Sequence, residues 1–279
     1  MKRQYLFTAF LAVTGFFSSC YDSQPPKGAL AFSTIQLTQT QHLFEDTLAP
    51  ACELKIDYTY PVDSSEKELL DSLNKLFIIH CFGEEYVGKE ATDVVRQYAE
   101  TYTRNYREDV EDTYLQDKKN KKGEDMTEVG GWYSYGKGIS SEVQFYEKNL
   151  LVYCINTYEY TGGAHGITLA YFLNIDLTKR RLLRLDDIFK GDDYRDTLSS
   201  LLWNQLIIDN KVDSREELEN MGYGSTGNLT PGENFYLDRE GITFYFNVYD
   251  FTPYVMGATE IKLPYDQVKG LINLKGIIN

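Results

Sequence analysis

Apolar and polar residues alternate with a period of two through much of the second half of the chain. Successive side chains of a β-strand point to opposite faces, so this period predicts strands. The alternating segments lie at about 139–147, 150–160, 167–177 and 181–184. Their connections are only a few residues long, which favours antiparallel hairpins over a parallel α/β sheet.

Helical spacing, with apolar residues three and four positions apart, appears in the first half. A strand at about 51–60 is expected to end at Pro61, and the helix that follows begins near Asp63. His80 lies at a helical position of that apolar stripe, so we interpret it as a core residue. A second helix, about 91–116, carries valines and tyrosines along one face.

The last third of the chain returns to mixed patterns. A leucine-rich helix is predicted at about 194–209, and a hairpin turns at 239–241. A strand at about 259–263 and a short helix from Asp266 follow. The whole pattern predicts an α+β fold: an antiparallel sheet of hairpins packed with a few helices, with two halves forming one compact ectodomain.

The N-terminus has the features of an export signal. Lys2 and Arg3 precede an apolar run of about 13 residues, which is short for a transmembrane helix, and small residues lead to Cys20. The position of Cys20 resembles a bacterial lipobox cysteine, so we expect residues 1–19 to be removed and Cys20 to carry lipid. Secretion without lipid and a retained anchor are the alternatives.

This signal sets the expected location and domain organisation. A lipid on Cys20 would hold the chain on a membrane outside the cytoplasm, facing the periplasm or the cell surface. Residues 20–35 are polar and contain prolines, as expected for a tether. We assign 36–125 to an N-terminal α+β domain and 126–279 to a C-terminal one.

The net charge limits the classes of partner, and the number of cysteines limits the possible disulfides. The formal net charge is −14, and loss of Lys2 and Arg3 makes it more negative, which argues against nucleic acid as a partner. Three cysteines follow Cys20, so at least one is left unpaired. We predict a Cys52–Cys81 disulfide and interpret Cys154 as a small buried apolar residue.

Catalytic motifs are missing from the sequence. It contains no His-Glu-x-x-His, Cys-x-x-Cys, Walker loop or Gly-x-Ser-x-Gly, and 3 scattered histidines are few for a metal site. We therefore predict no metal and no cofactor. The acidic pairs 186–187 and 192–193 leave a calcium site or a glycosidase-like pair open, although the second fits a helix N-cap.

The segment Tyr158 to Gly166, YEYTGGAHG, contains the most distinctive histidine of the chain. Its two adjacent glycines predict a tight turn with positive φ between two strands. His165 is then expected to hydrogen-bond that turn or to border a binding surface. Catalysis by His165 is the remaining alternative.

Several motifs together resemble a bacterial family. The Gly-Gly-Ala-His turn, the Leu-x-Asp-Ile-Phe segment at 185–189, Phe-x-x-Tyr at 251–254 and Leu-Pro-Tyr at 263–265 are similar to the C-terminal domain of RsiV/PdaC-like envelope proteins. The stretch CELKIDYTYPV resembles their PdaC-like N-terminal domain. The resemblance covers about residues 45–275.

This resemblance implies binding at the cell envelope, because PdaC-type deacetylation belongs to a separate metal-dependent domain for which this sequence has no motif. The expected partner is a cell-wall glycan or a protein such as lysozyme, whose basic charge suits an acidic chain. The candidate binding surface comprises Tyr158, Tyr160, His165, Tyr249 and Tyr254. The alternative function is a hydrolase or deacetylase acting on envelope polysaccharide through His165 and nearby carboxylates.

Overall fold

The computed structural model describes residues 8–14, 29–45, 49–120, 131–191 and 193–277. The chain forms two compact units that interleave in sequence. Unit 1 comprises Met1–Ser141 and Asn156–Ile167, and unit 2 comprises Glu142–Ile155 and Thr168–Asn279. The chain therefore passes from one unit to the other after Ser141, Ile155 and Ile167, and the domain boundary expected near residue 125 stays a prediction.

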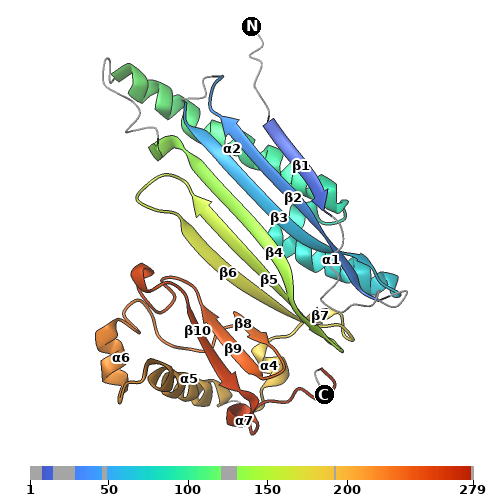
Figure 1. Cartoon of the computed structure of the whole chain (residues 1–279), viewed down its shortest axis with the longest axis vertical. Coiled ribbons are helices and arrows are strands. Elements are labelled where there is room, and N and C mark those ends of the chain that lie inside the picture. The colour runs from blue at the N-terminus through green and yellow to red at the C-terminus, as the bar shows by residue number, and fades with distance from the viewer. Residues whose placement is uncertain (1–7, 15–28, 46–48, 121–130, 192, 278–279) are drawn as a thin grey trace. The chain divides into compact units, whose positions relative to one another are not determined.

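The predicted α+β fold is confirmed (Figure 1). The larger sheet has the strand order β1-β2-β3-β4-β5-β6-β7. Its strands are β1 (Thr8–Thr14), β2 (Ala31–His42), β3 (Ala51–Asp63), β4 (Tyr135–Glu147), β5 (Leu150–Tyr160), β6 (Ile167–Asp176) and β7 (Arg181–Leu182). The predicted strands at 139–147, 150–160 and 167–177 match β4, β5 and β6 closely, because strong alternation is the most direct signal of a half-buried strand.

Unit 1 is a sheet covered on one face by helices α1 (Lys67–Cys81) and α2 (Ala91–Asn120), with the short helix η1 (Glu84–Tyr86) between them. α1 packs on β3, and α2 packs on both β2 and β3. Antiparallel pairing sets Leu37 of β2 opposite Ile56 of β3, and both are buried. Alternate residues of each strand therefore form the core beneath the helices.

β3 and β4 pair in parallel, with Cys52 opposite Tyr135 and Asp57 opposite Ser140. The sequence pattern predicts an antiparallel meander and does not reveal this pair. The reason is topological: α1, η1 and α2 form the long connection between the two strands, and parallel neighbours require such a crossover.

The prediction that Pro61 ends its strand is wrong, because β3 continues to Asp63. Pro61 stands opposite Phe32, and the register shifts between Phe32 and Ala31. Proline lacks a backbone N–H and is tolerated at such irregular positions of a sheet. The shift thus accommodates Pro61 inside the strand.

The interpretation of His80 as a core residue is also wrong, because its side chain is exposed. The buried residues of α1 are Leu73, Phe77, Ile78 and Cys81. Steps of four residues advance slightly more than one helical turn, so the buried stripe rotates along the helix and leaves His80 beside it. Neighbouring groups still exclude part of the water around His80, and this partial desolvation lowers the pKa of its imidazole.

Unit 2 contains a three-stranded antiparallel sheet in the order β10-β9-β8. α5 packs on β10, and α6 packs on α5. The further elements are α4 (Leu185–Ile188), α5 (Tyr194–Asn210), α6 (Arg215–Met221), β8 (Phe235–Leu237), β9 (Gly241–Phe246), η3 (Tyr254–Met256), β10 (Thr259–Pro264) and α7 (Tyr265–Val268). The core here is rich in leucine and phenylalanine, including Leu198, Leu202, Phe244 and Phe251.

Buried asparagines join β6 to the small sheet of unit 2. Asn174 of β6 donates from Nδ2 to the Phe235 carbonyl oxygen at 2.6 Å and accepts from the Leu237 N–H at 3.0 Å. Asn247 bonds both backbone groups of Ala170, at 2.7 and 3.0 Å. These side-chain amides make the hydrogen bonds that the backbone of a neighbouring strand would otherwise make. They satisfy backbone groups that would be buried without partners.

The structure describes only some of the residues on which the N-terminal predictions depend. Residues 31–35, assigned to the tether, form the beginning of β2. Thr8–Thr14, inside the predicted signal, pairs with β2 as strand β1. Cys20 lies outside the described residues. Within the described ranges, no helix combines the length and the apolar character needed to cross a membrane.

The predicted Cys52–Cys81 disulfide does not form; Cys52, Cys81 and Cys154 are buried thiols. Phe82, next to Cys81, packs edge-on against Tyr58 with ring centroids 4.9 Å apart. Tyr58 lies six residues along β3 from Cys52, which is roughly 20 Å in an extended strand. A disulfide requires Cα atoms within about 7 Å, so β3 itself keeps the two cysteines apart.

Candidate functional site

The loop between β5 and β6 is six residues long and contains the two glycines for which positive φ is predicted. Gly162 and Gly163 have φ values of 89° and 103°, a region that only glycine enters without strain. His165 is exposed at this turn, and its Nδ1 lies 3.1 Å from the Gly166 carbonyl oxygen. The prediction of a positive-φ turn is therefore confirmed, and His165 contacts backbone of the turn.

The side chain of Tyr158 in unit 1 packs closely against three glycines. A methyl group at Gly166 would approach its ring to 2.5 Å, and methyl groups at Gly136 and Gly138 of β4 would reach its side chain at 3.3 Å. The glycines let the ring lie close to backbone, where it covers surface that they leave bare. The ring of Tyr158 nevertheless keeps 42% of its surface exposed.

Tyr160 ties this turn to a second segment, η2 (Gly131–Tyr133). Its hydroxyl donates to the Gly163 carbonyl oxygen at 3.0 Å and lies 3.2 Å from the Gly131 carbonyl oxygen. A methyl group at Gly162 would lie 2.5 Å from the Trp132 carbonyl oxygen. The two backbones thus approach so closely that glycine is required at this contact.

η2 is anchored from its other side by α2. The Tyr133 hydroxyl donates to the Asp117 carboxylate, and its ring meets Tyr114 edge-on with centroids 5.3 Å apart. The hydrogen bond to Asp117 raises the pKa of Tyr133 to about 12. Trp132, between these two anchors, keeps 65% of its surface exposed.

We call Trp132, Tyr158, Tyr160 and His165 the hairpin-tip surface. It presents apolar aromatic faces beside hydrogen-bonding groups on backbone that hydrogen bonds and close packing hold in place. Exposed tryptophan and tyrosine with a fixed support are typical of binding surfaces, because they bury much apolar area and lose little conformational entropy. Flat aromatic faces of this kind suit the apolar face of a sugar ring or a side chain of a protein.

The other two predicted residues lie in unit 2. The rings of Tyr249 and Tyr254 are 5.7 Å apart, and both are exposed. Tyr249 has a φ of 71°, which fits a residue held in a turn. The structure therefore places Tyr158, Tyr160 and His165 in unit 1 and pairs Tyr249 with Tyr254 in unit 2.

Sequence reasoning missed Trp132, which is the most exposed aromatic residue of the described large apolar side chains. It is one of only 2 tryptophans in the chain and follows two glycines. A rare tryptophan after two glycines is visible in the sequence. Whether it belongs to a binding surface depends on the contact between η2 and the loop about 30 residues later. No periodicity reports such a contact.

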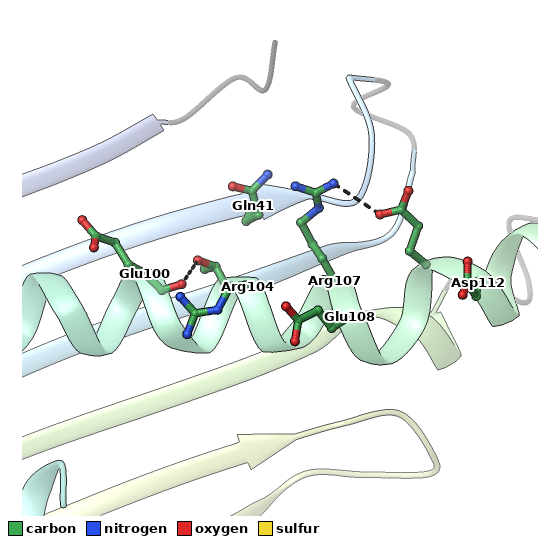
Figure 2. Close-up of a pocket in the computed structure, with 8 residues that line it drawn as sticks. Gln41, Glu100, Arg104, Arg107, Glu108 and Asp112 are labelled. Carbon is green, nitrogen blue, oxygen red and sulfur yellow. Dashed lines mark hydrogen bonds and ion pairs between the residues drawn. The ribbon is translucent and has the colours of Figure 1, made fainter. Parts of the chain in front are cut away.

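A pocket of unit 1 lies elsewhere, between the end of β2 and α2 (Figure 2). It has a volume of about 680 Å³, and Arg107 pairs with Glu111 at 3.2 Å inside it. Its lining residues are Gln41, Glu100, Thr103, Arg104, Arg107, Glu108, Glu111 and Asp112. The mixture of carboxylates and guanidinium groups indicates no single class of ligand.

Among the described residues, no three His, Cys, Asp or Glu side chains come together in an arrangement that could hold a metal ion. Asp186 and Asp187, adjacent in sequence, point to different partners: Asp186 accepts from Tyr194 and Asp187 pairs with Arg181 at 2.6 Å. The second acidic pair includes residue 192, which lies outside the described residues.

Comparison with known proteins finds two family models on this chain. "Protein of unknown function (DUF3298)" matches residues 186–266, and "Deacetylase PdaC" matches residues 51–168. The peptidoglycan-N-acetylmuramic acid deacetylase PdaC of Bacillus subtilis is 27% identical over 135 residues. That match covers 48% of this chain but only 28% of the relative, so the chain corresponds to a minor part of that protein.

Solved structures extend the likeness to nearly the whole chain. A DUF3298 family member from Bacteroides fragilis is 56% identical, with a TM-score of 0.84, and the match covers 88% of this chain and 94% of that one. A DUF3298 family protein from Pseudomonas aeruginosa shares the fold at 14% identity and a TM-score of 0.58, over 90% and 98% of the two chains. The resemblance inferred from the sequence motifs is confirmed.

Proposed function

The chain belongs to the DUF3298 family, and we propose that it is a non-enzymatic binding module of the bacterial envelope. In this proposal, residues 1–19 are removed and lipid on Cys20 holds the protein to a membrane outside the cytoplasm. The module recognises a cell-wall glycan or a protein such as lysozyme through the hairpin-tip surface.

The observation that carries the proposal is the exposure of Trp132 on an anchored support. A large indole that is 65% exposed lies between the Tyr133–Asp117 hydrogen bond and the backbone contact at Gly162. Exposed apolar area of this kind contributes to binding when a partner covers it, and prior anchoring reduces the entropy lost on association.

Two further observations support the class of ligand. The hairpin-tip surface and the contacts of Tyr133 with α2 all fall within the PdaC-like match at residues 51–168, and the name of the relative says that it acts on peptidoglycan. The net charge of −14, more negative once the leader is removed, favours association with basic proteins by electrostatic steering. Both observations fit a partner found in the cell wall.

The direct test is calorimetric titration of the purified protein with hen lysozyme and, separately, with soluble peptidoglycan fragments. We expect heat of binding with at least one of them. Trp132→Ala should weaken it about tenfold or more, the effect typical of a central aromatic contact. Tyr146→Ala is the matched control, because Tyr146 is also exposed but lies outside the hairpin-tip surface.

Two results would contradict the proposal: no binding of either ligand, or equal weakening by Trp132→Ala and Tyr146→Ala. Circular dichroism of each variant must first match that of the unmodified protein. This requirement separates loss of the surface from loss of the fold.

The alternative function is deacetylation or hydrolysis of envelope polysaccharide, which the name of the Bacillus subtilis relative favours. Its test is acetate release and reducing-end formation from peptidoglycan. We expect neither product above a protein-free blank. Activity that His165→Ala abolishes would replace the binding proposal with the enzymatic one.

A further inference from the structure

The outer edge of β2 lacks the protection that edge strands usually carry. Its twelve residues, AFSTIQLTQTQH, include no Lys, Arg, Asp, Glu or Pro. Natural sheets normally use charge, proline or an irregularity to stop another strand from pairing at an exposed edge. The only irregularity here is the register shift at Ala31, at the very start of the strand.

In the structure this edge is occupied by residues of the same chain. β1 pairs with β2 antiparallel from Thr8 opposite Thr40 to Thr14 opposite Thr34, seven consecutive pairs without interruption (Figure 1). The edge therefore accepts an antiparallel strand along seven of its twelve residues. The occupying residues belong to the segment whose removal the proposed function includes, so processing would leave seven residues of β2 paired with β3 alone and unpaired on their outer edge.

An uncharged strand is well suited to pair with a second copy of itself. Antiparallel pairing about a two-fold axis places each β2 opposite β2, so any charge near the centre would meet its own kind and repel it. β2 avoids this cost completely, although the chain as a whole is strongly acidic. Threonines opposite one another also form favourable cross-strand hydrogen bonds.

The helix-facing side of β2 supports the same occupant. Ile35 and Leu37 are buried under α2, and Gln39 and Gln41 follow them on the same face of the strand. Each of the four side chains is at most 4% exposed. A paired strand places alternate residues beside this row, so it needs apolar and uncharged polar residues in the same alternation. The sequence of β2 itself provides that alternation.

We propose that the processed chain forms a two-fold dimer in which the β2 strands of two copies pair antiparallel and join the two sheets. This inference rests on the removal of residues 1–19 in the proposed function. It does not involve the hairpin-tip surface, which belongs to β5, η2 and the turn after β5.

The experiment uses the full coding chain, expressed with two different C-terminal tags in one bacterium, and the processed protein is purified from its envelope in detergent. Mass spectrometry establishes whether the leader is absent. Capture on one tag then measures how much of the other copy is recovered. We expect both tags to co-purify, and an excess of a TAFLAVT peptide, the sequence of β1, to reduce their association.

Charge-swap variants identify the interface. Gln36 and Thr38 are exposed residues near the middle of β2. Gln36→Lys with Thr38→Lys, or both changed to Glu, should reduce recovery at least tenfold through like-charge repulsion across the two-fold axis. Co-expression of the Lys variant with the Glu variant should restore it. Thr92→Lys with Asn105→Lys, which adds equal charge on exposed positions of α2, is the matched control and should leave recovery unchanged.

Four outcomes would overturn the inference: a retained leader, no co-purification of the unmodified copies, equal disruption by the control, or no restoration in the mixed pair. Lysozyme or peptidoglycan titration of the Lys variant keeps the two proposals distinguishable. Binding that persists without dimers would refute only the dimer, and dimers without binding would refute only the hairpin-tip surface.

Discussion

At the scale of single residues, the geometry of the hairpin tip depends on glycines that serve different purposes. Gly162 and Gly163 supply positive φ angles for the turn. Gly166 has no such requirement, and its role is purely steric, because it leaves room for the Tyr158 ring. The sequence predicts the first role from two adjacent glycines, but the second depends on a contact that only the folded chain creates.

Gly166→Ala is predicted to displace Tyr158, because the new methyl group would lie 2.5 Å from the ring. Overpacking of this kind costs about 1–3 kcal/mol of unfolding free energy. Urea denaturation measures it. Gly131→Ala is the control, since it has open space around its Cβ position and should change stability by less than about 0.5 kcal/mol. Equal stability of the two variants would show that Tyr158 moves without cost.

At the scale of elements, pattern and pairing give different kinds of information. Alternation places β4, β5 and β6 within a few residues, yet it is silent about the parallel β3–β4 pair and about Asn174, whose amide bonds β8 across unit 2. A polar residue inside a strand pattern looks like an exposed position. It is buried here because its amide pairs with two backbone groups that need partners.

Asn174→Ala should therefore destabilise the protein strongly. It leaves the Phe235 carbonyl and the Leu237 N–H buried without their partner, at a cost of about 2–4 kcal/mol. Thermal or urea unfolding measures the change. The matched control is Asn149→Ala, which removes an exposed hydrogen bond to the Gly276 carbonyl oxygen and should cost about 1 kcal/mol or less. A similar loss in both variants would contradict a special role for Asn174.

At the scale of the whole molecule, the cysteines report both folding and processing. The chain has 4 cysteines, and the structure buries Cys52, Cys81 and Cys154. Burial raises the pKa of Cys52 to about 12, so its reactive thiolate is scarce at pH 8. Cys20 would be blocked as a thioether if it carries lipid.

We predict that the processed protein reacts slowly with Ellman's reagent in its native state at pH 8. In denaturant with prior reduction and desalting, it should release three equivalents of the chromophore, and Cys154→Ala should release two. Four equivalents from the unmodified protein would mean that Cys20 has a thiol, and the lipid-anchor proposal would then fail. Fewer than three would indicate that a described cysteine is modified in solution.

The sequence by itself determined the features that depend on neighbouring residues: the periods of strands and helices, the positive-φ turn at Gly162 and Gly163, and the family motifs. It determined the α+β class for the same reason. Each helix or strand buries one face, so its apolar residues recur at the short period of that element. These signals need no knowledge of which segment packs on which.

Only the tertiary structure decided which distant segments meet. It placed Trp132 beside the loop after β5 and paired β3 with β4 in parallel. It also separated Cys52 from Cys81 and left the outer edge of the uncharged β2 able to pair with a further strand. The physical reason is that such pairings follow from the packing free energy of the whole chain. Several pairings bury the same local pattern equally well, so the pattern alone cannot choose among them.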